Sequence, residues 1–335
     1  MKELEQILQL WETATAGGES AILATVVKTQ GSSYRLPGAR MLLTKLGQYA
    51  GSISGGCLEA DLLKKAWWLT ENGPAIRRYD TTSEGEIASD AFGLGCNGIV
   101  HVLLERVDSG SEVLKLLREV RTHRQLATIA HVVHPVGQAG EKLILGLQPH
   151  AADSRLPQFM EGREVFVETL APAVRLLVFG AGQDAVPLVG LAKYLGWQVF
   201  VFDGRSHYAR REKFPEADAV IVWSKGTPPN VDHWTAAVVM THSYNQDLEV
   251  LRELAPLPLR YLGLLGPHKR TAQLLIDAGL NNAPQAGIYS PTGLDIGADG
   301  PHQVALAILA EIQASLNGRE GGALRKRTGS IHSAA

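Results

Sequence analysis

A cysteine stands directly after a pair of glycines, at the residue where a helix is expected to begin. Gly55 and Gly56 precede Cys57, and the segment 57–73 has the apolar spacing of an amphipathic helix that ends at Gly73. The positive end of a helix dipole and its free N–H groups stabilise a thiolate, which is the nucleophilic form of cysteine and a soft metal ligand. Glycines also let another molecule come close to the backbone. The pattern therefore predicts a reactive or ligand-binding thiol at this position.

The second cysteine of the chain, Cys96, lies in another glycine cluster, 93–98, directly before a predicted strand. Both thiols therefore sit beside turns, although a free cysteine is often only a small buried apolar residue. The pattern does not favour a metal site made from these two thiols alone. Arg40 lies in the glycine-rich segment 31–56, and its guanidinium could meet an anionic ligand there. Glu59, in the first turn of the expected helix, opposes complete ionisation of the neighbouring thiol.

A turn of the form G-x-G-x-x-A occupies residues 180–185. Its fixed positions are Gly180, Gly182 and Ala185, and it lies between the predicted strand 175–179 and a predicted helix. In this context the first glycine allows a tight turn and the second lets the backbone approach a pyrophosphate. The small third residue lets the helix pack on the strand. The helix N-terminus then offers free N–H groups to phosphates, so dinucleotide binding is predicted, with an inherited turn that binds nothing as the alternative.

Three further side chains are expected at the same edge of the sheet. Asp203 follows the second strand and could accept a hydrogen bond from a ribose 2′-hydroxyl, whereas Arg205 could favour a 2′-phosphate. The choice between NAD and NADP therefore stays open. His242 follows a later strand and is a cofactor-binding candidate, with helix capping or packing as the alternative. No Tyr-x-x-x-Lys pair and no distinct His–Asp pair marks the proton donor that hydride transfer requires.

The composition describes a globular protein of about two domains. Of the 335 residues, 45% are hydrophobic and 20% are charged, which is too apolar for general disorder. The formal net charge of −2 argues against nucleic acid as a partner. Two cysteines cannot form a disulfide framework, which favours a reducing, cytoplasmic setting. The first residues have helical spacing rather than that of a signal peptide, and no apolar run reaches the roughly 18 residues that would predict a membrane helix.

The order of the expected elements divides the chain into two domains and a tail. Residues 1–170 are predicted to form a mixed α/β domain. From 171 to 317, short apolar strands alternate with helices, which indicates a Rossmann-like, doubly wound parallel sheet. The stretch 148–173 carries three prolines and is expected to be irregular, with the boundary near Leu170. The tail 318–335, rich in Gly, Arg and Ser, is expected to be disordered.

These motifs together resemble the XdhC/CoxI family, whose members are accessory factors for molybdenum hydroxylases such as xanthine dehydrogenase. The matching segments of the first half are GSSYRLPGARMLLT, GSISGGCLEADL and GLGCNGIVHVLLE. Those of the second half are LLVFGAGQDAVPLVGLAKYLGWQVFVFDGR, VVMTHSYNQDLEVL, YLGLLGPHKR and PTGLDIGADGPHQVALAILAEI. The resemblance runs in order over about residues 10–316. Asn97 and Tyr34 depart from the glycine and proline expected at those positions, which affects local turn geometry only.

The resemblance implies a chaperone that binds the molybdenum cofactor, either molybdopterin or its dinucleotide form. It also implies that the protein supports sulfuration and protection of this cofactor and its insertion into an apo molybdenum hydroxylase, with a cysteine desulfurase as a second partner. Cys57 matches the cysteine implicated in cofactor binding in that family, so it would contact molybdenum through the bound cofactor. A maturation chaperone is therefore favoured over a turnover enzyme.

Two other functions remain open from the residues themselves. The first is an NAD(P)-dependent oxidoreductase that uses the glycine turn and Asp203. The second is a persulfide relay in which Cys57 or Cys96 carries sulfur from the desulfurase. The oligomeric state is also open, with a homodimer as the working expectation.

Overall fold

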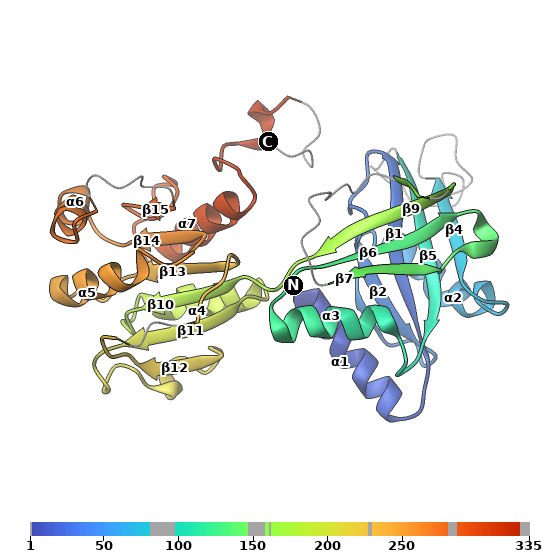
Figure 1. The fold of residues 1–335 in the computed structure, drawn as a ribbon, viewed down its shortest axis with the longest axis horizontal. Helices are drawn as coiled ribbons and strands as arrows, with labels where there is room; N and C mark the ends of the chain where they lie inside the picture. Colours follow the sequence, from blue (N-terminus) through green and yellow to red (C-terminus); the bar gives the residue numbers. More distant parts are fainter. Residues whose placement is uncertain are drawn as a thin grey trace. The chain divides into compact units, whose positions relative to one another are not determined.

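The computed structural model describes residues 2–80, 98–146, 158–160, 162–226, 230–280 and 287–328. The chain forms two compact units, Met1–Pro172 and Ala173–Ala335, here called unit 1 and unit 2. Both units mix helices and strands (Figure 1). In the ranges just given, no helix is long and apolar enough to cross a membrane.

The described residues of unit 1 form two antiparallel sheets and three α-helices. The five-stranded sheet has the order β3 (Tyr49–Gly51), β2 (Arg40–Thr44), β1 (Ala21–Gly31), β5 (Gly98–Val107) and β4 (Ala75–Asp80). The four-stranded sheet has the order β7 (Lys142–Gly146), β6 (Ala127–His134), β9 (Arg163–Leu170) and β8 (Gln158–Met160). The helices are α1 (Lys2–Ala16), α2 (Cys57–Leu69) and α3 (Glu112–His123), and a 3-10 turn, η1, spans Val136–Gln138.

The first part of strand β1, residues 21–27, is buried on both faces, which explains why it is apolar except at Thr25. Successive side chains of a strand point to opposite faces of the sheet. Ala21 and Leu23 pack in the cluster that includes α1, α3 and part of the four-stranded sheet. Ile22 and Ala24 pack in the cluster that includes α2. Helix α2 therefore covers one face of the five-stranded sheet, while α1 and α3 cover the other (Figure 1).

Three strands of unit 1 lie where the sequence predicts none. Strands β8 and β9 fall in the stretch 148–173, for which the sequence predicts irregular structure, and β9 pairs with β6 along Ala127–His134. Strand β4 is the polar edge strand AIRRYD, and β5 is its partner among the described strands. An edge strand of this composition has no apolar run of its own, so its conformation depends on the partner strand.

Unit 2 is a six-stranded sheet in which every neighbouring pair is parallel. Its order is β12 (Ala219–Val222), β11 (Gln198–Asp203), β10 (Arg175–Phe179), β13 (Thr235–Val239), β14 (Tyr261–Leu264) and β15 (Ile288–Tyr289). Counted within the unit this is 3-2-1-4-5-6, the order of a Rossmann fold. The predicted doubly wound parallel sheet is confirmed.

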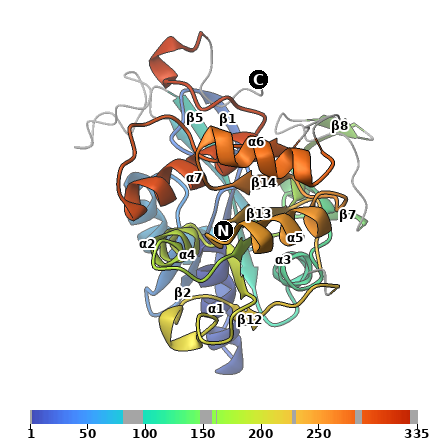
Figure 2. The same ribbon diagram turned by 90° about the vertical axis from the view of Figure 1, so that its left-hand side faces the viewer.

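Helices cover both faces of this sheet. Helices α4 (Ala185–Tyr194) and α7 (Pro301–Leu316) pack on one face, and α5 (Tyr244–Leu254) and α6 (His268–Asp277) pack on the other (Figure 2). Two 3-10 turns, η2 (Arg211–Lys213) and η3 (Leu324–Lys326), complete the described elements. The residues from 318 to 328 are irregular apart from η3.

Candidate functional site

The strand order of unit 2 reverses between β10 and β13, and ligands of open α/β sheets bind outside the carboxyl ends of the strands at such a point. The segments that follow these two strands meet there. The amide of Gly180 donates to the Phe202 carbonyl over 2.7 Å, and the amide of Met240 donates to the Phe179 carbonyl over 2.7 Å. The first bond joins the glycine turn to β11, and the second joins the segment after β13 to the end of β10.

Gly180 is required by both its backbone conformation and its surroundings. Its φ is 125°, and a Cβ at this residue would lie 2.3 Å from the Met240 carbonyl oxygen. Gly182 differs, because its φ is outside the left-handed region and the closest contact of its Cβ would be a side-chain atom, the Oδ1 of Asp184, also at 2.3 Å. Ala185 is fully buried in the core beneath α4, as the third position of the motif requires.

We expect Gly180→Ala to lower the free energy of unfolding by about 3 kcal/mol, since a non-glycine residue is strained at that φ and main-chain atoms block the Cβ. Gly182→Ala should cost less than about 1 kcal/mol, because the Asp184 side chain can rotate away. Urea denaturation of both variants, followed by circular dichroism, measures the difference. Equal losses would contradict this interpretation of the turn.

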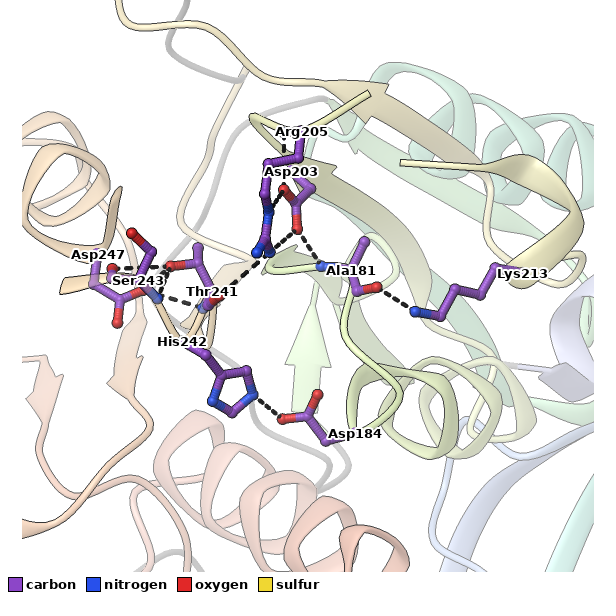
Figure 3. A network of polar contacts seen from close by, with 9 residues as sticks. All are labelled: Ala181, Asp184, Asp203, Arg205, Lys213, Thr241, His242, Ser243 and Asp247. Carbon is purple, nitrogen blue, oxygen red and sulfur yellow. Dashed lines mark hydrogen bonds and ion pairs between the residues drawn. The ribbon is translucent and has the colours of Figure 1, made fainter. Parts of the chain in front are cut away.

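Asp203 does not present an open carboxylate at the end of β11. Its Oδ2 accepts from the Ala181 amide over 2.9 Å and from Arg205 Nη2 over 2.8 Å (Figure 3). Its Oδ1 accepts from the Arg205 amide and from Arg205 Nε, each over 2.9 Å. Burial raises the pKa of Asp203, but the hydrogen bonds from Arg205 and Ala181 more than offset this and lower it. The Asp203 carboxylate, which the sequence predicts to accept from a ribose hydroxyl, therefore accepts from Arg205 instead. Asp203 also orders the glycine turn through its bond from the Ala181 amide.

His242 and Asp184 form a His–Asp pair that the sequence pattern did not predict. His242 Nε2 lies 2.7 Å from Asp184 Oδ2, and the imidazole projects beside the glycine turn (Figure 3). His242 also has a φ of 60°, which is uncommon for a residue other than glycine. The two residues are 58 positions apart in the sequence, so no local pattern could reveal the pair.

Other polar groups complete this edge of the sheet. Lys213 Nζ donates to the Ala181 carbonyl over 2.5 Å, and Thr241 donates through Oγ1 to Asp247 over 2.6 Å (Figure 3). The Thr241 carbonyl accepts from Arg205 Nη2 over 3.3 Å. Lys213 comes from η2, a short turn with no motif that marks it in the sequence.

In unit 1, Cys57 is the first residue of α2, as predicted, and its thiol is free and partly exposed. Gly55 and Gly56 have φ angles of 102° and 123°. A Cβ at Gly55 would lie 3.1 Å from the Tyr34 ring, whereas no atom lies within 4 Å of a Cβ at Gly56. Among the described residues, the backbone just before the thiol is therefore open on the Gly56 side.

The loop before Cys57 is organised by one carboxylate, that of Glu59. Its Oε1 accepts from the amides of Ile53 and Ser54 over 2.8 and 2.9 Å, and its Oε2 accepts from the Gly56 amide over 2.9 Å. The hydroxyls of Ser52 and Ser54 also donate to it. Burial raises the pKa of Glu59, but the hydrogen bonds from Ser54 and from backbone amides lower it to about 2. The spacing of three residues from Gly56 is the sequence signal for this role.

The stability that Glu59 contributes should be lost in acid. Its pKa lies below the ordinary value of 4.5, so the contribution is complete above about pH 5 and disappears as the pH falls towards 2. At pH 7 we expect Glu59→Gln to lower the free energy of unfolding by about 2 kcal/mol, since amide donors lose their charged acceptor. Urea midpoints of both proteins at pH 7 and pH 3 test this. If the difference in urea midpoint between the two proteins is as large at pH 3 as at pH 7, this prediction is wrong.

Arg40 does not face a ligand-accessible surface. Its guanidinium is buried and donates to Glu168, whose Oε1 also lies 3.3 Å from His131 Nε2. Burial lowers the pKa of Arg40 to about 10, against the opposing charge of Glu105. Burial, and then the charges of Arg40 and Lys142, hold the pKa of His131 well below its ordinary value. The expected anion-binding role of Arg40 is therefore replaced by a place in a buried charged network between the two sheets.

Cys96, the second candidate thiol, lies outside the described residues. Within those residues, no group of three or more His, Cys, Asp or Glu side chains could hold a metal ion. The candidate residues thus fall into two separate groups, one around Cys57 in unit 1 and one at the switch point of unit 2.

The fold and these two groups define the class: a two-unit protein with a Rossmann-type second unit and a glycine-flanked thiol on its first. Residues 176–312 match the family model of the XdhC Rossmann domain, and residues 14–80 match that of the XdhC and CoxI family. The chain belongs to the XdhC/CoxI family, which confirms the resemblance seen in its sequence.

Named relatives agree with this membership over most of the chain. A Bacillus subtilis protein, named as a probable subunit of xanthine dehydrogenase, is 35% identical over 314 residues, which cover 88% of this chain and 92% of that protein. The Escherichia coli molybdenum cofactor insertion chaperone PaoD is 28% identical over 309 residues, covering 91% and 86%. A crystal structure described as a xanthine dehydrogenase from Bacillus halodurans has a TM-score of 0.80 and 32% identity, covering 93% of this chain and 96% of that one.

Proposed function

We propose that this protein is a molybdenum cofactor insertion chaperone that loads the cofactor into an apo molybdenum hydroxylase. Family membership and the name of its relative PaoD support this role. The structural observation that supports this role is the position of Cys57, which is the first residue of α2 and directly follows two glycines.

The residues around Cys57 suit such cargo. A thiolate is a soft ligand that matches molybdenum and sulfur chemistry, and the thiol here is free and partly exposed. The open side at Gly56 leaves room for a bulky group beside the sulfur. Glu59 fixes the loop through its backbone amides, so the thiol keeps its position before the cargo arrives. The cofactor itself supplies the molybdenum centre and its terminal sulfido group.

The proposed role includes two protein partners and a cellular setting. The chain shields the cofactor while a cysteine desulfurase supports its sulfuration, and then transfers it to the hydroxylase, acting as a homodimer in a reducing cytoplasm. Cys96 is retained as a second sulfur-handling thiol. The glycine turn of unit 2 is the proposed binding site for a nucleotide, either that of the dinucleotide form of the cofactor or NAD(P).

Co-expression with a molybdenum hydroxylase tests the proposal. Omitting this protein should lower the sulfido content and the activity of the purified hydroxylase at least tenfold, with its yield unchanged. A hydroxylase that is equally sulfurated and equally active without this protein would exclude the proposed role.

A second candidate function is favoured by the His242–Asp184 pair. A His–Asp pair beside a glycine turn is an arrangement that can serve as acid and base in hydride transfer. An NAD(P)-dependent oxidoreductase would show turnover in a substrate screen, and His242→Gln would abolish it. Nucleotide binding without turnover would exclude this alternative and leave a structural or regulatory nucleotide.

A further inference from the structure

The end of strand β11 presents a positive surface although it contains an aspartate. The Asp203 side chain is 0% exposed, whereas that of its partner Arg205 is 31% exposed. Among the described residues, the donors to this carboxylate come from Ala181 and Arg205, which hold it inside the turn. A molecule that approaches this edge therefore meets the guanidinium and not the carboxylate.

Arg205 is held in one orientation. Its Nε and Nη2 are bonded to Asp203, and its guanidinium carbon lies 4.0 Å from the centre of the Tyr208 ring. Within the part of the chain that the structure describes, its Nη1 has no hydrogen-bond partner. A guanidinium fixed in this way is preorganised for a phosphate oxygen.

Lys213 brings a second positive charge to the same place. Its Nζ lies 5.6 Å from the centre of the Tyr208 ring and donates one hydrogen bond, to the Ala181 carbonyl. An ammonium group has three N–H donors, so two remain for a ligand. The segment 205–213 is basic, with Arg210 and Arg211 against one acid, Glu212. The acid of the glycine turn itself, Asp184, is partly buried and is bonded to His242.

We propose that Arg205 and Lys213, at the end of β11, form a receptor for a phosphate monoester. This group is carried at the ribose 2′ position of NADP and also by the pterin cofactor, so two sources share the chemistry. A free ribose 2′-hydroxyl does not find an open carboxylate acceptor here, because Asp203 already accepts from Ala181 and Arg205. The receptor specifies the ligand chemistry of the nucleotide site proposed for unit 2, so it rests on that part of the proposed function and not on the chaperone role of Cys57.

Calorimetry on the full chain with NADP⁺ and NAD⁺ tests the receptor, because these probes differ only in the 2′-phosphate. We expect NADP⁺ to bind at least tenfold more tightly. Lys213→Met should weaken NADP⁺ binding about tenfold, whereas Lys193→Met, which removes a lysine of α4 that is bonded to Asp218, should leave it unchanged. Arg205→Ser, checked for folding by circular dichroism, should shift the preference towards NAD⁺, because Asp203 loses the two guanidinium donors and keeps only backbone amide donors, so it can accept from a ribose hydroxyl.

A parallel arm with purified molybdopterin separates the two sources. If neither nucleotide binds but Lys213→Met weakens molybdopterin binding about tenfold, the receptor serves the pterin phosphate. The inference is overturned if NAD⁺ binds as tightly as NADP⁺, or if Lys213→Met changes the binding of no probe. In either case, loss of hydroxylase sulfuration without this protein would still support the chaperone role, so the two proposals fail independently.

Discussion

Replacing Cys57 with serine is expected to reduce the molybdenum retained by the purified protein at least about tenfold, which corresponds to about 1.4 kcal/mol of binding free energy. Serine preserves the size of the side chain and the loop held by Glu59, but its hydroxyl is a hard, un-ionised oxygen and a poor molybdenum ligand. The loss should therefore come from the donor atom and not from folding.

The measurement is the molybdenum content per chain after incubation with the cofactor and gel filtration. Cys96→Ser is the comparison variant, since it removes the other thiol of the chain, which is proposed to handle sulfur and not to bind molybdenum. Circular dichroism of both variants should match that of the wild type. Equal molybdenum retention by Cys57→Ser and the wild type would remove Cys57 from the proposed mechanism. Loss only in Cys96→Ser would transfer the role to that residue.

Replacing Glu168 with alanine should lower the free energy of unfolding by about 4 kcal/mol, because it leaves the buried charge of Arg40 without its partner. His131 cannot compensate, since an imidazole is either neutral or positive and its lowered pKa keeps it neutral at pH 7. Glu105 is already bonded to Lys142 over 2.5 Å. With total stabilities of about 5–15 kcal/mol, such a loss is large for one residue.

Glu164 on the same strand provides the control. Its carboxylate pairs with Lys28 over 2.6 Å at a partly exposed site, so Glu164→Ala should cost less than about 1 kcal/mol. The double variant Arg40→Met with Glu168→Leu should recover much of the loss, because no buried charge is then left alone. Urea denaturation measures all three. Similar losses in Glu164→Ala and Glu168→Ala would contradict the buried network.

The sequence alone determined the features that depend on neighbours along the chain. The strands of unit 2 are short apolar runs between helices, so their type and the parallel sheet follow from local pattern. The glycine turn after β10 and the helix that begins at Cys57 also have local signals, since turn geometry and helix starts are set within a few residues. Family membership followed from the same segments.

Only the tertiary structure decided which charged groups meet. The sequence favours Arg40 as a residue for a ligand, but packing of the two sheets of unit 1 places it against Glu168, 128 positions away. The sequence favours Asp203 as a ribose acceptor, but the glycine turn brings Ala181 to it and Arg205 fills its remaining lone pairs. Whether a charged side chain faces solvent, a ligand or an opposite charge depends on burial and on partners remote in sequence, and no local pattern contains that information.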